Sequence, residues 1–451
     1  MIASPPGTEW RRLHPLTPLV RFGRLILAVA LITVPYLGST RSPRGRFELL
    51  YPVVIWAGLI GLGSVSAIVS WAVTRWRIDG GDLRIETGFI RKQSIRIPLA
   101  RIQAVDIVAP LIARVLGLAE VRVVSAGRGG EHGRLAYLTA QEAPQVRARL
   151  LALAHGLAAE TPEPPAVPLL HVDNGRLVAG LSMRAQVLVP LTVMLVAIIG
   201  AAVAPGPGVA ALGSVLTIVF AAAVALVRAF NEDFDFSISE AGDGLRLDRG
   251  LLQRRHETIP FGRIQAVRLV QPVLWRVFGW WRLEVDVARQ HGPRDGSDQG
   301  GAHLARTLVP VAPRAQALWV LARVFPDAGV APPAGAEPPT RALAKAPLSY
   351  HYLAAWYGNR YVYARTGRVQ QAIVVVPLGK IQSLRLREGP VQRRLRLATL
   401  DIDTAGRRWE ASARCRDVAD AERMLWELTE RARIARRTSV THAAVPATAP
   451  A

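Results

Sequence analysis

The sequence predicts a membrane protein of mixed α and β structure, with three copies of a small, strongly bent sheet closed by one helix and four transmembrane helices in two hairpins. Three observations support this prediction. A motif of about forty residues occurs three times, long uncharged stretches precede the first two copies, and each copy alternates apolar and polar residues before an amphipathic pattern.

The repeated motif starts at Gly88 and contains Ile97-Pro98 and the run from Arg101 to Val105. Moved by 162 positions it returns from Gly250, and moved by 279 positions it returns, more divergent, from Gly367. A match kept in register over this length indicates three copies of one module. The two intervals are 162 and 117 residues, and their difference of 45 is about the length of a membrane hairpin.

The composition favours a chain that works at a membrane. Half of the residues are hydrophobic, the mean hydropathy is +0.22 and the formal net charge is +22. Such a charge attracts polyanions, which for a hydrophobic chain means anionic lipid headgroups before nucleic acid. An arginine-rich composition with positive cytoplasmic loops would give the same excess without any ligand. Cys415 is the only cysteine, so no disulfide framework or cysteine-based metal site is predicted.

Two uncharged stretches near the N-terminus predict the first hairpin. Residues 25–40 are somewhat shorter than the ~20 residues that cross a bilayer, so this span must tilt little, let Arg24 snorkel or thin the membrane. Residues 49–74 are long enough, and Trp71 and Trp76 suit the membrane interface. A buried helix of a soluble protein is the alternative for this second stretch. Basic residues in the connector leave the orientation of this hairpin undecided.

Residues 185–227 predict the second hairpin more clearly. They carry no charge, and the Ala204-Pro-Gly-Pro-Gly208 sequence divides them into two halves. Proline and glycine end helices, and a connector without charge crosses a membrane readily. Arg184 and Arg228 flank the pair, which places both outer ends in the cytoplasm. Two hairpins return the chain to one side, so the N-terminus and all three modules are expected to be cytoplasmic.

Each copy shows several short strands followed by one helix. Alternating apolar and polar residues predict strands at 76–79, 82–86 and 95–97 in the first copy, at 234–239, 245–248 and 283–287 in the second, and at 361–363 and 373–377 in the third. Amphipathic closing helices are expected at about 142–155, 313–325 and 418–437.

These patterns divide the chain into nine segments. They are an N-terminal cytoplasmic segment (1–24), the first hairpin (25–74), the first module (75–159), a linker (160–184), the second hairpin (185–227), the second module (228–326), a proline-rich linker (327–345), the third module (346–437) and a disordered tail (438–451).

The motif residues resemble a known group of domains. The Gly88 turn, the Ile-Pro-x-x-Arg-Ile-Gln-x-Val core and the Pro110-x-x-x-Arg114-x-x-Gly117 turn are similar to the bacterial pleckstrin-homology-like (PH-like) domain of YdbS- and YdbT-type membrane proteins. Three copies with two hairpins are most similar to the YdbT type. The resemblance implies PH-like half-open β-barrels of seven strands, each capped by a C-terminal helix, at the bacterial inner membrane beside a smaller one-module relative. It implies no enzymatic activity.

The third copy departs from this pattern at three positions. Lys380 replaces the motif arginine, Gly389 stands where Pro110 stands in the first copy, and Arg396 stands where Gly117 stands. A ligand site shared by all copies is therefore least expected in the third.

The first candidate site is the basic residue and glutamine of the Arg-Ile-Gln element. On an extended strand the two side chains share one face, and a cation beside an amide could hold a phosphate or carboxylate. The favoured alternative is that they tie down loop carbonyls or an internal acid within each module. The six residues are Arg101, Gln103, Arg263, Gln265, Lys380 and Gln382.

The second candidate is a basic collar around the glycine turn. Each lysine or arginine near an anionic leaflet contributes roughly 1 kcal/mol of attraction, so several could hold a tethered module on the bilayer. A solvated charged face is an equally good interpretation. The collar residues are Arg84, Arg91, Lys92, Arg96, Arg254 and Arg255. The third copy has uncharged residues at the corresponding turn.

Two further groups are interpreted mainly as structure. Trp275, Phe278, Trp280 and Trp281 could enter a lipid interface, but packing around a short turn is favoured. Asp401 and Asp403 alternate along a predicted strand, which a polar outer face explains. Phosphate-loop and serine-hydrolase motifs are absent, histidines form no metal-ligand pattern, and the spans hold no ionisable residue for transport. No catalytic residue, cofactor or metal is predicted.

The sequence therefore predicts a non-enzymatic scaffold of the bacterial inner membrane whose three cytoplasmic modules bind a protein partner or the membrane surface. The expected partners are membrane lipids and a smaller one-module PH-like membrane protein or a second copy of the chain, with no nucleic acid. An anionic-lipid headgroup sensor, or an accessory subunit of an export or envelope-stress system, is the alternative.

Overall fold

The computed structural model describes residues 10–20, 22–23, 46–79, 81–88, 92–125, 133–154, 156–158, 161, 165–203, 207–242, 244–288, 306–406, 409 and 411–444. The chain forms two compact units. Unit 1 holds residues up to Pro165 together with Gly250–Thr258 and Gln290–Pro293, and unit 2 holds the remainder.

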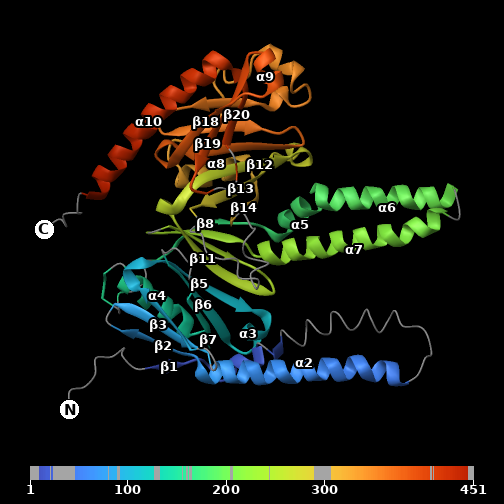
Figure 1. The fold of residues 1–451 in the computed structure, drawn as a ribbon, viewed down its shortest axis with the longest axis vertical. Helices are drawn as coiled ribbons and strands as arrows, with labels where there is room; N and C mark the ends of the chain where they lie inside the picture. The colour runs from blue at the N-terminus through green and yellow to red at the C-terminus, as the bar shows by residue number, and fades with distance from the viewer. Residues whose placement is uncertain are drawn as a thin grey trace. The chain divides into compact units, whose positions relative to one another are not determined.

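Unit 1 contains the first module and is built from two antiparallel sheets (Figure 1). The first sheet has the order β1-β2-β3-β4, and in the second the order β7-β6-β5-β11 lies within unit 1. The elements are β1 (Arg11–Arg12), α2 (Arg46–Val73), β2 (Arg75–Asp79), β3 (Asp82–Thr87), β4 (Gln93–Pro98), η1 (Leu99–Arg101), β5 (Ile102–Pro110), α3 (Leu111–Val115), β6 (Leu118–Ser125), β7 (Gly133–Thr139), α4 (Glu142–Ala154) and β11 (Gln253–Pro260), the last up to Thr258.

Unit 2 begins with β8 and the helices that follow it. Strands β10, β9 and β8 are neighbours in that order, and a six-stranded antiparallel sheet has the order β14-β13-β12-β17-β16-β15. The elements up to its centre are β8 (Val167–His171), α5 (Asn174–Ser182), α6 (Ala185–Val203), α7 (Pro207–Asp233), β9 (Ser237–Ala241), β10 (Gly244–Arg249), η2 (Phe261–Arg263), β12 (Ile264–Pro272), η3 (Val273–Arg276), β13 (Trp280–Val287), β14 (Arg306–Pro313) and α8 (Arg314–Val324).

The third module completes unit 2. Its first three strands join the six-stranded sheet, and its last three form the sheet β18-β19-β20, which α10 covers. Its elements are η4 (Thr340–Ala344), η5 (Tyr350–Tyr352), β15 (Ala354–Tyr357), β16 (Tyr361–Thr366), β17 (Gln370–Pro377), η6 (Leu378–Lys380), β18 (Ile381–Arg387), α9 (Pro390–Arg394), β19 (Leu397–Thr404), β20 (Ala411–Asp417) and α10 (Val418–Ala444).

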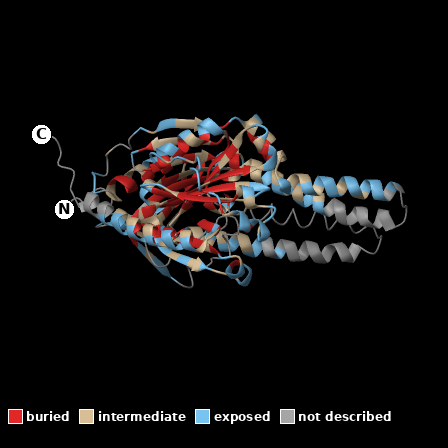
Figure 2. Ribbon diagram, turned by 90° about the horizontal axis from the view of Figure 1, so that it is seen from above, coloured by how far each residue is buried: buried red, intermediate tan, exposed pale blue. Residues whose placement is uncertain are grey.

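The predicted alternation produces the cores. In β3, Leu83 and Ile85 point inward and are almost fully buried, while the residues between them are more exposed. In α4, Ala143, Val146 and Leu150 share one helix face and close the sheet from one side. Figure 2 shows buried residues concentrated on the strands and exposed residues along the long helices. The predicted strands and closing helices are confirmed, except that the strand predicted at 234–239 begins only at Ser237.

The long apolar helices are inserted after the first strand of a module. Helix α2 lies between β1 and β2 in the first copy, and α6 and α7 lie between β8 and β9 in the second. The third copy passes from η5 directly into β15. The difference of 45 residues between the two repeat intervals therefore corresponds to a helical insertion that the third copy does not have.

Only part of the predicted membrane spans lies within the described residues. The stretch 25–40 lies outside the described residues. Within the described part of the chain, no single helix meets the length and hydropathy required to cross a membrane. The bent pair Asn174–Ser182 and Ala185–Gly200, with an angle of 52°, meets the requirement together, and Gly61–Val73 is a shorter apolar helix.

The proline-rich linker is packed against the third module. Arg416 donates hydrogen bonds of 2.9 and 2.8 Å to the carbonyl oxygens of Ala336 and Glu337, and Ala336 is buried. The Tyr350 hydroxyl donates to the carbonyl of Pro338. These contacts fix a segment whose composition is typical of a spacer.

Candidate interface between modules

The motif glycines form the turns that precede β4, β11 and β17, one in each module. Gly250 and Gly367 have φ of +108° and +92°, in the left-handed region that L side chains rarely adopt. A Cβ on Gly367 would lie 2.1 Å from the carbonyl oxygen of Gln370, and a Cβ on Gly250 would lie equally close to that of Gln253. The turn therefore requires glycine at both positions.

Strands β11 and β17 each pair with the preceding module instead of closing their own barrel alone. Strand β11 of the second module pairs antiparallel with β5 of the first, with Pro110 opposite Gln253. Strand β17 of the third module pairs with β12 of the second, with Pro272 opposite Gln370. The offsets 272 − 110 = 162 and 370 − 253 = 117 are the repeat intervals, so the two junctions have the same register.

The arginine of the Pro-x-x-x-Arg motif holds the next module's turn at both junctions. Arg114 donates a hydrogen bond of 3.1 Å to the carbonyl oxygen of Leu251, the residue after Gly250. Arg276 donates one of 2.6 Å to the carbonyl oxygen of Arg368, the residue after Gly367, and its guanidinium lies over the ring of Tyr352. The motif spacing therefore reflects a contact between modules, which sequence reasoning alone did not identify.

The Arg-Ile-Gln residues have different roles in different copies. Arg263 donates to the carbonyl oxygen of Ala288 at 3.1 Å, within its own module. Lys380 donates to the carbonyl oxygen of Gly262 at 2.7 Å, in the preceding module. Arg101 is exposed and has no polar partner among the described residues. Both bonds end on backbone carbonyls, but only that of Arg263 stays within its own module, whereas the interpretation of this element expected such contacts within each module.

The three glutamines differ in burial. Gln265 is buried and its amide donates to the carbonyl oxygen of Arg263. Gln382 is exposed, because β18 is an edge strand whereas β12 is covered by β17. The side chain of Gln103 lies outside the described residues.

The residues of the basic collar lie on different strands and do not form one cluster. Arg84 and Arg96 face each other across β3 and β4, and Arg84 also lies 3.9 Å from Asp79. Lys92 is exposed, and Arg91 lies outside the described residues.

The collar residues of the second copy lie at the junction itself. Arg254 and Arg255 lie on β11, opposite Ala109 and Val108 of β5. They therefore belong to the sheet that joins the first module to the second.

The aromatic group divides into a buried part and an exposed part. Trp275 is fully buried beneath α5, and its indole N–H donates to the carbonyl oxygen of Gly180 at 3.1 Å. Trp281 is also buried, whereas Phe278 is half exposed and stacks on Trp280 with ring centroids 4.8 Å apart. Packing accounts for Trp275 and Trp281 but leaves Phe278 available at the surface.

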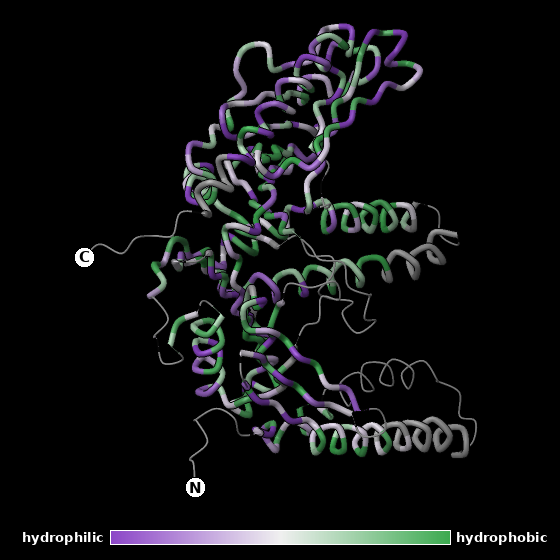
Figure 3. The backbone as a smooth tube through the Cα atoms, turned by 60° about the vertical axis from the view of Figure 1, so that its left-hand side comes forward, coloured by the Kyte–Doolittle hydropathy of each residue, from purple (hydrophilic) through white to green (hydrophobic). Residues whose placement is uncertain are grey.

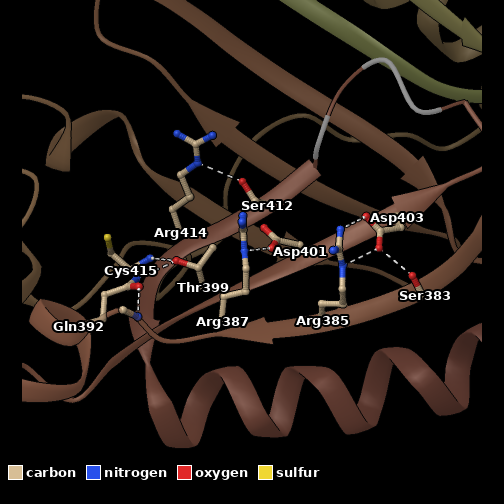
Figure 4. Close-up of polar contacts among 11 residues, drawn as sticks. Ser383, Arg385, Arg387, Gln392, Thr399, Asp401, Asp403, Ser412, Arg414 and Cys415 are labelled. Atoms are coloured by element: carbon tan, nitrogen blue, oxygen red, sulfur yellow. Dashed lines mark hydrogen bonds and ion pairs between the residues drawn. The ribbon is translucent and has the colours of Figure 1, made fainter.

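Two carboxylate and arginine pairs cross from β19 to the edge strand β18 (Figure 4). Arg385 donates two hydrogen bonds of 3.0 Å to Asp403, and Ser383 donates one of 2.7 Å to the same carboxylate. Arg387 forms an ion pair with Asp401, which is only 1% exposed. Asp401 and Asp403 lie on the face of β19 opposite the core residues Leu400 and Ile402, as a polar outer face predicts, but Asp401 is buried on that face in its ion pair with Arg387.

The pKa of the Asp403 carboxyl is lowered by its polar partners on β18. Burial raises the pKa of this carboxyl, but the hydrogen bonds from Arg385 and Ser383 and the charges of Arg385 and Arg387 outweigh it and bring the pKa below its ordinary value. Asp403 is therefore ionised throughout the neutral range, and the cationic charge of the β18 edge is largely compensated by its own module.

A cavity of about 740 Å³ lies beside this edge in the third module. Its lining includes Gln392, Thr399 and Cys415, and the Gln392 amide donates to the Thr399 hydroxyl at 2.8 Å. Burial raises the pKa of the Cys415 thiol, so it stays protonated at neutral pH. No group of potential metal ligands occurs among the described residues.

Antiparallel sheets bent into tandem modules, each closed by a C-terminal helix and joined edge to edge, define a protein of PH-like modules. The chain belongs to the bacterial PH domain family, whose pattern matches residues 25–154, 187–325 and 307–432. The three matches confirm the threefold repeat, and modules of this family suggest a role in binding or as a scaffold. Neither the curated proteins nor the solved structures gave a significant match.

Proposed function

We propose that the chain is a non-enzymatic scaffold of the bacterial inner membrane, anchored by its inserted helices, whose modules bind proteins along the cytoplasmic surface. The observation that carries this proposal is the recurrence of exposed apolar side chains at one place in every module. In the first two modules this place adjoins the inserted helices.

The exposed apolar residues follow the repeat. Val115 on α3 is 78% exposed, and Val277 after η3, at the same repeat position, is 81% exposed. In the third module this position is Arg394, and the exposed apolar residue of the same turn is Val391 on α9, which is 55% exposed. Large apolar side chains that recur in the open at one site are typical of a surface that contacts another molecule or a membrane.

In the second module this surface lies at the base of the inserted helices. Trp275 packs with Leu177 and Leu181 of α5, and Leu226 and Phe230 of α7 pack against the same cluster. The short turn that carries Val277 and Phe278 is therefore fixed to the end of α7. If α6 and α7 cross the bilayer, this turn lies at its cytoplasmic interface, where apolar and aromatic side chains are favoured.

The inserted helices themselves support a lipid environment. On α6, Val196 and Ile199 are more than half exposed, and on α7 Phe220 is 69% exposed. Figure 3 shows the described part of α6 as a continuous hydrophobic stretch. Contact with lipid chains carries no free-energy cost for these apolar side chains, whereas their exposure to water does.

The basic residues favour the scaffold over the headgroup sensor. Arg263 and Lys380 donate to backbone carbonyls, and Arg254 and Arg255 lie on a strand inside a sheet. Side chains held by backbone carbonyls, as those of Arg263 and Lys380 are, are poor candidates for a lipid site. Lys92 and Arg101 are exposed, so their positive charges can still attract an anionic membrane surface.

Extraction and labelling of the full chain in bacterial membranes test the proposal. Sodium carbonate and high salt should leave the chain in the membrane pellet. A membrane-impermeant maleimide should label Gly208→Cys in intact spheroplasts, but label Lys92→Cys and Gln382→Cys only after the membrane is permeabilised. The unmodified chain is the control, because its single thiol is buried. Release by salt, or labelling of Lys92→Cys in intact cells, would overturn the proposal.

A further inference from the structure

The chain uses one docking geometry twice and leaves the two halves of a third junction open. Strand β5 of the first module accepts β11 of the second, and β12 of the second accepts β17 of the third. In the third module the accepting strand is β18, and in the first module the docking strand is β4. Both are edge strands in the described sheets.

Strand β18 has the exposure expected of an uncovered acceptor. Gln265 and Val270 of β12 are 5% and 1% exposed, and Val270 pairs with Ala372 of β17. Their repeat counterparts on β18 are Gln382, which is exposed, and Arg387, whose side chain is 59% exposed. The difference follows from the missing neighbour, because an edge strand leaves one row of backbone groups and adjacent side chains open to solvent.

Arg393 is the unused donor of this edge. It stands at 114 + 279 = 393 and 276 + 117 = 393, so it is the repeat counterpart of Arg114 and Arg276. Each of those arginines donates to the carbonyl oxygen that follows the next module's glycine turn. Arg393 is exposed on α9, and its guanidinium has no partner among the described residues.

Strand β4 presents the complementary half. Gly88, which precedes it, has φ of +96°, in the same region as Gly250 and Gly367. In β4, Gln93, Ser94 and Arg96 are exposed, whereas Ile97 is buried in the module's own core. Strand β4 is therefore already folded in the single chain, and docking requires no further folding of this strand.

We propose that a second copy of the chain docks its β4 on β18, so that copies join head to tail through the geometry already used within the chain. This proposal rests on the scaffold function proposed above and identifies its partner. The shared register places Ile95 opposite Arg385, Gln93 opposite Arg387 and Lys92 opposite Glu388.

Charge at the new junction is compatible with this register. Asp401 and Asp403 already pair with Arg387 and Arg385, so these arginines do not present bare charge to the incoming strand. Glu388 would meet Lys92, an opposite-charge cross-strand pair, where the existing junction has Gln271 opposite Gln371. The strand edge, glycine turn and charge of β4 in a second copy therefore match the β18 edge.

The interface is heterologous, because different surfaces of the two copies meet. Such contacts form rings if the rotation closes and open chains if it does not. Association should therefore continue beyond the dimer.

The test uses full-length protein in mild detergent, followed by analytical ultracentrifugation over a concentration series. Dimers and larger species should form, and Arg393→Ala should weaken association about tenfold, as expected for loss of a hydrogen bond from a charged donor. Arg394→Ala, its exposed neighbour on α9, should have no effect. Glu388→Lys should weaken association roughly threefold to tenfold, and the double variant Glu388→Lys, Lys92→Glu should restore it.

Disulfide trapping fixes the polarity of the contact. Glu388→Cys and Lys92→Cys proteins, purified separately and mixed, should cross-link to a dimer far more than either does alone. Equal cross-linking of each variant by itself, a monomer at all concentrations, or cross-linking in native membranes to another protein only would overturn the inference. A monomer that remains in the membrane pellet refutes head-to-tail docking alone, whereas release of the chain by salt refutes the scaffold function.

Discussion

The guanidinium of Arg276 lies 2.6 Å from the carbonyl oxygen of Arg368, so a short turn of the second module holds the turn that opens a strand of the third. Arg114 and Leu251 repeat the contact between the first and second modules. In the first two copies the motif arginine is thus explained by an interaction between copies, not within one.

Replacement of Arg276 by alanine should destabilise the chain by about 1–2 kcal/mol, because a charged hydrogen bond and the contact with Tyr352 are both lost. Chemical denaturation measured by tryptophan fluorescence checks this. Arg393→Ala is the matched control, since it removes the same motif residue where no partner is present, and it should change stability by less than about 0.5 kcal/mol. Equal losses in both variants would contradict the assignment.

Replacement of Gly367 by alanine should cost about 1–3 kcal/mol, because the added Cβ meets a backbone oxygen and φ is +92°. Gly358→Ala is the control, with nothing within 4 Å of the added carbon. Thermal unfolding followed by circular dichroism measures both. A larger loss at Gly358 would show that the turn at Gly367 is not the constrained one.

Acid should weaken the third module through Asp403. Its folded pKa lies below the ordinary value, so its contribution to stability is complete above the unfolded pKa and disappears as the pH falls through the lowered folded pKa. Unfolding midpoints measured from pH 7 down to pH 3 should fall less steeply for Asp403→Asn than for the unmodified chain. Ser383→Ala, which removes one hydrogen bond to the carboxylate, should give an intermediate slope.

Cys415 should react slowly with thiol reagents at neutral pH. Its side chain is buried and burial raises the pKa of the thiol, so little thiolate forms and access is restricted. Labelling with a maleimide in buffer and in denaturant should differ by at least about a hundredfold in rate. Fast labelling of the folded chain would mean that β20 opens readily.

The hydrophobic periodicity of the sequence predicted most strands of the modules and their closing helices. The alternation of Leu83 and Ile85 with polar residues, and the spacing of Ala143, Val146 and Leu150, are local patterns that tie each residue to a face of one strand or helix. The pairing of β11 with β5 was not predicted, because both strands alternate normally and nothing local states which sheet a strand will join.

The candidate sites show the same division. The spacing of Arg101, Arg263 and Lys380 identified a repeated element but could not show that Lys380 reaches Gly262 in the preceding module. Asp401 and Asp403 share one face of β19, yet only Asp401 is buried, and the sequence pattern could not show how neighbouring side chains cover one carboxylate more than the other. The first predicted span and Arg91 lie outside the described residues and stay predictions.

By itself the sequence determined the number of modules, their strands and closing helices, and the position of the helical insertions, because repeats and hydrophobic periods are written in neighbouring residues. Only the tertiary structure decided that the modules share sheets and that the motif arginines hold the turns of the next module. These contacts join residues about 100 positions apart, as in the pairing of Pro272 with Gln370, and a strand edge accepts any partner whose register and turn geometry fit.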